Sequence, residues 1–523
     1  MSNKLEIKRN VPLEIADFEQ LLMGNTKVEI SKDVSKEVKK SFDFLKKYAS
    51  NKIIYGINTG LGPMAQYKIE DDKPVELQFN LIRSHAAGVD RPLDDKSVLA
   101  SLLTRINCFC KGYSGVHPNV INTIKHLINH KVIPLIPEHG GVGASGDLVQ
   151  LAHIALVLIG EGKVKYNGEW QDTAKVMAEL GISPINIHIR EGLAMINGTS
   201  VMTGIGITNI INAKNLLNWC LSASIMLNEI VSTYDDHYSA ELNDLKGHPG
   251  QRNVARIMRE VLQSSKLTSS RQEELYSVNN NGSFKIDKKV QEYYSLRCVP
   301  QILGPVLDTI LYAERIIIDE ANSVSDNPII QKDKEYVYHG GNFHGDYVSF
   351  EMDKIKIAVT KLSMLAERQL NFTVNHRLNK ILPPFVNLGT LGLNLGMQGA
   401  QFTAVSTTAE NQTLSNPMYI HSIPNNNDNQ DIVSMGTNSA LICKKVIENS
   451  YQVLAIELMT LLQAVDYLNI ASKLSDHSKE IYTELREIFP KFIEDYPVYE
   501  DIEKVINFTV NNKKEIIKES HYE

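Results

Sequence analysis

Apolar and polar positions alternate along this chain mainly with the period of an α-helix. In one stretch, Met352, Ile355 and Val359 follow one another at three- and four-residue spacing, which places them on one helix face. Four stretches predict long helices: residues 199–233, 300–322, 346–379 and 440–470. Because these lengths exceed the usual mean of about 11–12 residues, we expect a mainly α fold built on a long central helix bundle.

The first two hundred residues show a more mixed pattern. Amphipathic helices are predicted over residues 33–49, 95–110 and 117–130. Glycine-rich loops are expected at residues 56–62, 140–146 and 191–204, and a small hairpin near Tyr336 and Tyr338. We therefore predict a loop-rich N-terminal domain over residues 1–198 and a long-helix domain over residues 199–523.

The composition excludes several classes of function. The 523 residues are 43% apolar and 22% charged, with a net charge of −7, which is typical of a globular protein and gives no support for nucleic-acid binding. No apolar run is long enough to span a membrane, and the N-terminus has no signal core. The five cysteines lack zinc-ligand spacing, and no metal is expected. A cytoplasmic location follows as an expectation.

The tripeptide Ala144-Ser145-Gly146 carries the most specific chemistry. Gly146 offers a backbone nitrogen with no side chain to obstruct its approach to the Ala144 carbonyl. Ring closure followed by loss of the Ser145 hydroxyl as water would leave an electrophilic methylene group. The surrounding glycines allow the positive φ values that such a tight turn needs, although glycine-rich turns containing a serine are also common without this chemistry.

The same stretch also fits the dinucleotide fingerprint G-x-G-x-x-G from Gly141 to Gly146, with Glu161 as a ribose ligand. That fingerprint requires a preceding buried strand. Here Pro134 and Pro137 interrupt the preceding segment, and proline removes the donors that a central strand needs. Dinucleotide binding is therefore disfavoured.

Other polar loops offer further candidates, each with an ordinary structural alternative. Tyr55, in a glycine-rich loop, would accept a proton if its pKa were lowered; otherwise it is a packing tyrosine. Arg297 lies among apolar residues and needs a carboxylate, either from the protein or from a substrate. Asn327 in a Ser-Asp-Asn-Pro turn, the loop around Phe343, and Glu410 are equally consistent with turns and solvated surface.

The order of these motifs is far more specific than any one of them. Seven occur in sequence: Tyr-Gly-Ile-Asn-Thr-Gly from 55, Gly-Ala-Ser-Gly-Asp-Leu from 143, Asn-Gly-Thr from 197, Tyr-Ser-Leu-Arg-Cys from 294, Ser-Asp-Asn-Pro from 325, Gly-Asn-Phe-His from 341 and Glu-Asn from 410. Over about residues 12 to 470, the chain resembles the aromatic amino acid ammonia-lyases and aminomutases. It looks most like bacterial tyrosine ammonia-lyases.

The resemblance implies that Ala144-Ser145-Gly146 matures into 4-methylidene-imidazol-5-one (MIO), with no external cofactor. It also implies a mainly helical homotetramer in which three subunits contribute to each active site. By the same match, Tyr55 would remove the β-proton, Arg297 and Asn327 would bind the substrate carboxylate, and Phe343 would pack on the MIO ring. The other matched residues would hold the electrophile and the amine or line the site: Asn197, Tyr294, Gln291, Glu410 and Asn429.

Two positions bear on the substrate ring. In the family, the position of His85 contacts the substrate side chain, and a histidine there suits a phenol or an imidazole better than a phenyl ring. Histidine ammonia-lyases carry a glutamate where this chain has Gln430, and a neutral amide would not pair with an imidazole. Together His85 and Gln430 favour L-tyrosine, converted to 4-coumarate and ammonia, since a site that binds a hydroxyl rejects an analogue lacking it.

Three alternatives remain open at this point. His85 also suits a histidine ammonia-lyase, which would form urocanate. A tyrosine aminomutase would use the same electrophile and differ in how long the product is retained. A catalytically silent helical scaffold belongs to another class, and the intact Ala144-Ser145-Gly146 together with Tyr55 argues against it.

Overall fold

The computed structural model describes residues 3–70, 72–276, 283, 285–286 and 289–518. Helices dominate the described chain and strands form only small sheets, as the apolar period predicts. The chain forms two compact units, each assembled from three separate segments. Unit 1 comprises Met1–Ile211, Ala313–Asp353 and Pro417–Lys444, and unit 2 comprises Asn212–Tyr312, Lys354–Asn416 and Lys445–Glu523. The expected boundary between residues 198 and 199 stays a prediction.

Unit 1 contains eight shorter helices among its described residues: α1 (Ile15–Leu22), α2 (Lys32–Tyr48), α3 (Pro74–His85), α4 (Asp95–Cys110), α5 (Pro118–Asn129), α6 (Leu148–Leu158), α7 (Thr173–Glu179) and α8 (Glu191–Ile196). Single 3-10 turns lie at Ala49–Asn51, Gly62–Met64 and Lys332–Lys334. The predicted amphipathic helices correspond to α2, α4 and α5. In α2, for example, Val34, Val38 and Leu45 are buried on one face.

The strands of unit 1 form separate small sheets. β1 (Asn3–Ile7) pairs in parallel with β2 (Thr26–Ile30), and β3 (Val89–Pro92) pairs antiparallel with β5 (Pro137–His139). A three-stranded sheet has the order β4 (Ile133–Pro134), β6 (Lys163–Tyr166), β7 (Glu169–Asp172), and β8 (Ile329–Gln331) forms the predicted hairpin with β9 (Tyr336–Tyr338). Because β5 leads into the glycine-rich turn from an antiparallel pair, the strand-turn-helix of a dinucleotide fold is not formed there.

Four long helices contribute residues to both units: α9 (Ser200–Ile230), α13 (Val299–Ala321), α14 (Asp346–Val374) and α17 (Gly436–Leu468). Three of them match the predicted stretches closely. The expected helix over residues 346–379 is instead two helices, since α14 ends at Val374 and α15 (His376–Asn379) follows. Asn375 separates them because its side-chain oxygen accepts from the Arg377 backbone N–H at 3.1 Å and caps a new helix.

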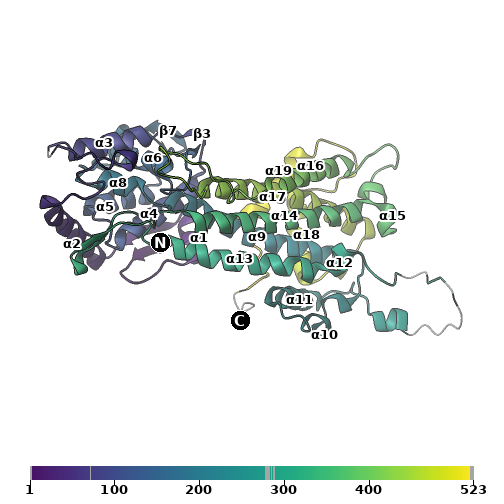
Figure 1. The fold of residues 1–523 in the computed structure, drawn as a ribbon. Helices are drawn as coiled ribbons and strands as arrows, with labels where there is room; N and C mark the ends of the chain where they lie inside the picture. Colours follow the sequence, from purple (N-terminus) through teal and green to yellow (C-terminus); the bar gives the residue numbers. More distant parts are fainter. Residues whose placement is uncertain (1–2, 71, 277–282, 284, 287–288, 519–523) are drawn as a thin grey trace. The chain divides into compact units, whose positions relative to one another are not determined.

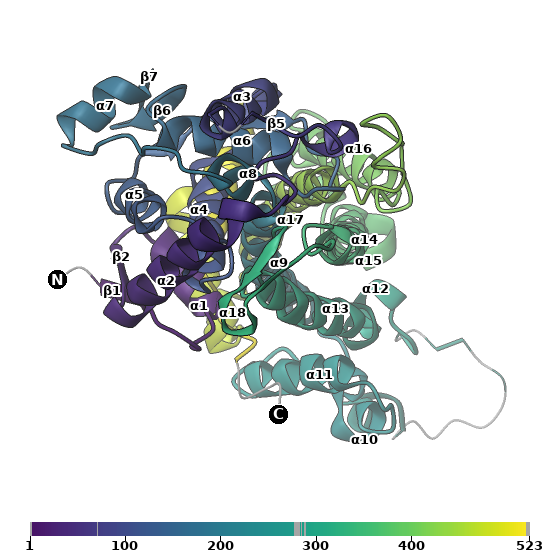
Figure 2. The same ribbon diagram turned by 60° about the vertical axis from the view of Figure 1, so that its left-hand side comes forward.

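Unit 2 adds shorter helices to its parts of the long ones: α10 (Ala240–Asn243), α11 (Pro249–Leu262), α12 (Tyr294–Arg297), α16 (Gln398–Leu414), α18 (Asp476–Ile488) and α19 (Tyr499–Asn511). Short turns lie at Asp235–Tyr238, Gln272–Tyr276, Pro384–Val386 and Ala471–Lys473. Buried polar bonds join the long helices inside this unit: Ser224 Oγ donates to Gln369 Oε1 at 3.0 Å, and Asn215 Nδ2 to the Tyr451 hydroxyl at 3.0 Å. Figure 2 shows α10 beside α11, in contact with it.

The helices around the glycine-rich turn position it within unit 1. α6 begins directly after the turn, and α8 ends directly before Asn197. α3 packs against both of these helices (Figure 1). In the part of the chain that the structure describes, no helix combines the length and the apolar character that crossing a bilayer requires.

Candidate active site

The turn that contains Ala144, Ser145 and Gly146 has a backbone that only glycine satisfies at two positions. Gly143 and Gly146 have φ values of +79° and +70°. A Cβ atom on Gly143 would collide with Ser434 Oγ, and one on Gly146 would collide with the Gly198 carbonyl oxygen. Both the positive φ and the close contacts therefore require glycine. Ala144 is buried, whereas Ser145 remains partly exposed.

Segments that are distant in sequence hold this turn from several sides. Asp147 N–H donates to the Gly198 carbonyl at 2.8 Å. The Gly143 carbonyl accepts from Gly345 N–H and from Ser434 Oγ, each at 3.1 Å. The turn is thus bonded to the segment after Asn197, to the loop that carries Phe343 and to the segment after Gln430.

Gln430 contacts the tripeptide directly. Its Nε2 donates to Ser145 Oγ at 3.0 Å. Gln430 lies in a narrow loop that is closed by reciprocal backbone hydrogen bonds with Asn425, of 3.1 and 3.3 Å. Asn429, the preceding residue, is exposed and donates from its N–H to the Asn426 carbonyl at 3.2 Å. Of this pair, only Gln430 has a hydrogen bond to the turn among the described residues.

Asn197 lies at the end of α8, next to the glycine that pairs with Gly146. Its side chain is buried, and Oδ1 has no hydrogen-bond partner among the described residues. Its carbonyl accepts from Arg105 Nη2 at 2.8 Å. A buried amide oxygen without a partner is costly. This unpartnered oxygen, together with the close contacts that exclude a Cβ at Gly143 and Gly146, fits a turn that carries an additional polar ring such as MIO.

The Tyr55 loop is joined to α8 and to the Gln430 loop. The Tyr55 hydroxyl accepts from Gly62 N–H at 3.2 Å. Gln78 links this loop to α8, since its Nε2 donates to the Gly56 carbonyl at 3.4 Å and its Oε1 accepts from Leu193 N–H at 3.0 Å. A Cβ on Gly62 would lie 2.8 Å from Asn426 Nδ2. Tyr55 therefore belongs to the same cluster of loops as the turn.

Asn327 and Phe343 are brought to the same cluster. Asn327 is buried, and its Oδ1 accepts from Gly340 N–H at 2.8 Å. Ser325 Oγ, two residues earlier, accepts from Thr199 N–H at 3.4 Å. Phe343 is partly buried in the loop whose Gly345 bonds to the turn. Both residues thus lie on segments that contact the turn or its immediate neighbours.

His85 ends α3 and is partly exposed. Its Nδ1 lies 2.9 Å from the Leu81 carbonyl and 3.1 Å from Ser84 Oγ. A carbonyl can only accept, so the proton of the neutral ring resides on Nδ1 and Nε2 is an acceptor. No hydrogen bond joins His85 to the turn in the described structure. Its link to the turn is through β3, which pairs with β5.

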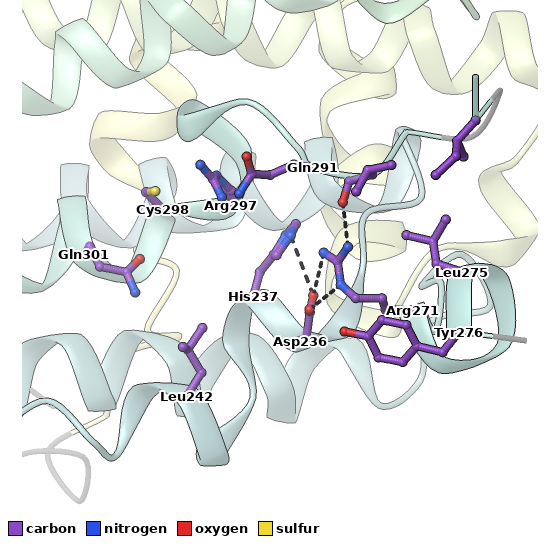
Figure 3. A pocket seen from close by; sticks show the side chains of 12 residues that line it. Asp236, His237, Leu242, Arg271, Leu275, Tyr276, Gln291, Arg297, Cys298 and Gln301 are labelled. Carbon is purple, nitrogen blue, oxygen red and sulfur yellow. Dashed lines mark hydrogen bonds and ion pairs between the residues drawn. The ribbon is translucent and has the colours of Figure 1, made fainter. Parts of the chain in front are cut away.

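The remaining predicted residues belong to unit 2. Figure 3 shows two of them, Gln291 and Arg297, side by side in a pocket. Arg297 ends α12, and its guanidinium carbon lies 4.7 Å from the centre of the Tyr294 ring. With its amide oxygen towards the guanidinium, Gln291 accepts from Arg297 Nη2 at 3.3 Å. Gln291 and Arg297 line a cavity of about 700 Å³. Glu410, exposed on α16, instead accepts from Asn449 Nδ2 at 2.7 Å.

Several residues that support the site could not be singled out from the sequence. Asp147 is buried, its carboxylate accepts from the N–H groups of Val201 and Met202 at 2.7 and 3.0 Å, and burial raises its pKa to about 6. Gln78 and Arg105, which lie on helices, also form hydrogen bonds to residues of the site. Only Asp147 carried a signal, its position directly after the turn; the other two are polar residues of helices with no local motif.

The chain is similar over most of its length to known proteins. A family model described as aromatic amino acid lyase matches residues 13–487. The chain is 40% identical over 450 residues to a tyrosine 2,3-aminomutase of Myxococcus fulvus, covering 85% of each. It is 37% identical over 503 residues to a histidine ammonia-lyase of Shouchella clausii, covering 96% of this chain and 97% of that relative. A crystal structure of tyrosine aminomutase from Streptomyces globisporus superposes with a TM-score of 0.92 at 35% identity, covering 97% of both chains.

Proposed function

This chain belongs to the aromatic amino acid lyase family, and we propose that within it the protein deaminates L-tyrosine to 4-coumarate and ammonia. The hydrogen bond from Gln430 to Ser145 carries the proposal, because it places a neutral amide next to the tripeptide. A carboxylate at this position would favour an imidazole ring through a charge-assisted hydrogen bond, whereas an amide lacks the charge for such a pair.

The proposal has Ala144, Ser145 and Gly146 as the source of MIO. When formed, this group supplies an electrophile for the substrate amine, which makes nitrogen a better leaving group. The residues that surround it here are Asn197, whose Oδ1 is buried without a partner, and Gln430. Phe343 lies on the loop bonded to Gly143 and would pack on the group's face.

His85 provides recognition of the phenol. Because its Nδ1 bonds to the Leu81 carbonyl, its Nε2 accepts a hydrogen bond. A tyrosine hydroxyl would donate to this nitrogen, and a phenylalanine ring would leave it without a partner in a partly buried site. His85 therefore favours tyrosine over phenylalanine, and Gln430 favours tyrosine over histidine.

The carboxylate and the β-proton involve other residues. Arg297 presents a planar guanidinium that suits a bidentate carboxylate, and Asn327 adds an amide. Tyr55 would take the β-proton as general base. Tyr294, Gln291, Glu410 and Asn429 are proposed to line the site.

Assembly is part of the proposal. The turn, Tyr55, His85 and Gln430 lie in unit 1, whereas Arg297, Tyr294 and Gln291 lie in unit 2. We propose that these groups meet in a homotetramer in which loops from three subunits form each site. The molecular mass in solution, measured by light scattering, tests this assembly, and a monomer with full activity would contradict it.

A tyrosine aminomutase is the second candidate. Relatives named tyrosine 2,3-aminomutase share 40% identity with this chain. The proposed substrate, tyrosine, is therefore also compatible with a different reaction. An aminomutase returns the amine to the β-carbon before the product leaves, and a lyase releases the unsaturated acid. The substrate residues His85 and Gln430 serve both reactions equally.

Product identification separates these candidates. Purified protein is incubated with L-tyrosine alone, and products are resolved by chromatography with ultraviolet detection. 4-Coumarate and ammonia in equal amounts are expected; β-tyrosine as the main product would assign the aminomutase. Ser145→Ala, which lacks the hydroxyl lost on ring formation, is the inactive control, and Ser323→Ala on the surface should retain full activity.

A further inference from the structure

A group of three side chains in unit 2 fastens the backbone directly before Gln291. The Tyr234 hydroxyl donates to the Lys289 carbonyl at 2.9 Å. Arg271 Nη1 donates to the next carbonyl, that of Val290, at 2.6 Å. Two consecutive carbonyls are therefore each bound by a side chain from elsewhere in the unit.

The same three side chains hold one another. Arg271 Nε donates to Asp236 Oδ2 at 2.6 Å and Nη2 to Asp236 Oδ1 at 3.4 Å, which is the forked arrangement of an arginine on a carboxylate. The Arg271 guanidinium carbon also lies 4.2 Å from the centre of the Tyr234 ring, within the range of a cation–π contact. We call Tyr234, Asp236 and Arg271 the anchor (Figure 3 shows Asp236 and Arg271).

The anchored segment needs this support. Residues 289–293 lie outside the helices and strands of the described chain, and Val290 and Gln291 are exposed. With its amide oxygen towards the guanidinium, Gln291 accepts from Arg297. The Nε of Arg297 is buried without a hydrogen-bond partner among the described residues. The position of Gln291, and through it the orientation of Arg297, thus depends on where the anchor holds the backbone.

We infer that Tyr234, Asp236 and Arg271 are positioning residues that orient Arg297 for the substrate carboxylate. The inference rests on the proposed function in taking Arg297 as the carboxylate-binding residue. Asp236 and Arg271 line the same cavity as Arg297. The Arg271 guanidinium is already bound to Asp236 and to the Val290 carbonyl, so the anchor acts through the backbone that it holds. Its loss should weaken every ligand that carries the carboxylate and leave ligands without one unaffected.

Arg271→Met tests the inference, since it removes both the carbonyl bond and the pair with Asp236. KM for tyrosine should rise roughly 10- to 100-fold, with kcat changed less, because a carboxylate bond is made in both ground and transition states. Inhibition by 4-coumarate should weaken by a similar factor. Inhibition by 4-ethylphenol, which keeps the phenol but lacks the carboxylate, should stay within about twofold.

Milder variants provide the same test if Arg271→Met does not fold. Tyr234→Phe deletes only the hydroxyl that bonds Lys289, and a KM increase of roughly three- to tenfold is expected. Arg271→Lys keeps the charge for Asp236 and should lie between the wild type and Arg271→Met. Arg252→Met is the matched control, because Arg252 also binds two backbone carbonyls, those of Lys246 and Asp244; its KM should equal that of the wild type.

The outcomes separate the inference from the proposed function. Equal weakening of 4-coumarate and 4-ethylphenol, or no change in either, would overturn the anchor's role. If the wild type deaminates histidine or phenylalanine but not tyrosine, only the tyrosine proposal is contradicted. The anchor is then tested with urocanate or cinnamate as the carboxylate-bearing inhibitor in place of 4-coumarate. A wild type that acts on none of the three would contradict both.

Discussion

Gln430 donates a hydrogen bond from Nε2 to Ser145 Oγ over 3.0 Å, although 285 residues separate the two in sequence. The contact connects the residue proposed to favour tyrosine over histidine with the residue whose hydroxyl would be lost on ring formation. In the proposed function, selection of the substrate ring and the chemistry at the amine are therefore adjacent. Changes at Gln430 should alter which amino acid is used before they alter whether the protein folds.

Gln430→Glu should shift preference towards histidine. A carboxylate at this position can bind an imidazole and cannot donate as the amide does. The ratio of kcat/KM for histidine to that for tyrosine should rise by roughly tenfold or more, the effect of about 1.4 kcal/mol. Urocanate and 4-coumarate formed from the separate substrates measure the ratio. An unchanged ratio, equal to that of the exposed control Gln263→Glu, would remove Gln430 from ring selection.

His85→Phe should shift the preferred substrate from tyrosine to phenylalanine. The variant loses the Nε2 acceptor for the phenol, so kcat/KM for tyrosine should fall roughly 10- to 100-fold, while that for phenylalanine rises. Initial rates with each amino acid give both values. His126→Phe, on α5, is the control and should leave the preference unchanged. A proportional loss for both substrates would mean that His85 supports the fold and does not contact the ring.

The loops of the site divide into parts that local sequence predicts and parts that it does not. The turn at Gly143 and Gly146 was predictable, because glycine at close spacing indicates positive φ. Gln78, Arg105 and Ser434 were not, because each reaches the site from another segment and lies in no local motif. Contacts of this kind depend on tertiary packing, which the pattern along one segment does not contain.

The fold shows the same division. The long helices were predictable because their apolar period persists over many turns. The pairs β1–β2 and β3–β5 were missed, since strands of three to five residues give a weak period and their partners lie elsewhere in the chain. Arg297 lies in the short helix α12, directly before the long helix α13.

Replacement by alanine should lower the unfolding free energy by different amounts at two glycines with similar backbone conformations. Gly146 and Gly168 have φ values of +70° and +86°, but a Cβ on Gly146 would meet the Gly198 carbonyl and one on Gly168 would meet nothing within 4 Å. Gly168→Ala should lose only about 1 kcal/mol of unfolding free energy through backbone strain. Gly146→Ala should lose clearly more and also fail to form the ring. Urea unfolding and the mass of the peptide containing residue 145 measure both; equal losses would contradict the close contact.

Glu191 should make stability depend on pH. Burial raises its pKa from 4.5 to about 7, although it accepts from the N–H groups of His117 and His188 at 2.6 Å each. The folded state therefore binds a proton more tightly than the unfolded state, so this contribution is complete below about pH 4.5 and is lost as the pH rises through 7. Its size is about 3 kcal/mol at most.

Urea unfolding of Glu191→Gln across pH 5 to 7 measures this dependence. The variant should show a flatter fall in unfolding free energy over this range than the wild type, because its amide does not titrate. The exposed control Glu179→Gln should follow the wild type. A variant curve parallel to that of the wild type would show that Glu191 does not titrate in this window.

Competition between substrates tests the central claim most directly. The protein is given equal concentrations of L-tyrosine, L-histidine and L-phenylalanine in one vessel, and 4-coumarate, urocanate and cinnamate are quantified at low conversion, so that their ratios equal the ratios of kcat/KM. 4-Coumarate should exceed each of the others by at least about tenfold. Urocanate or cinnamate as the main product would contradict the assignment of this protein to tyrosine.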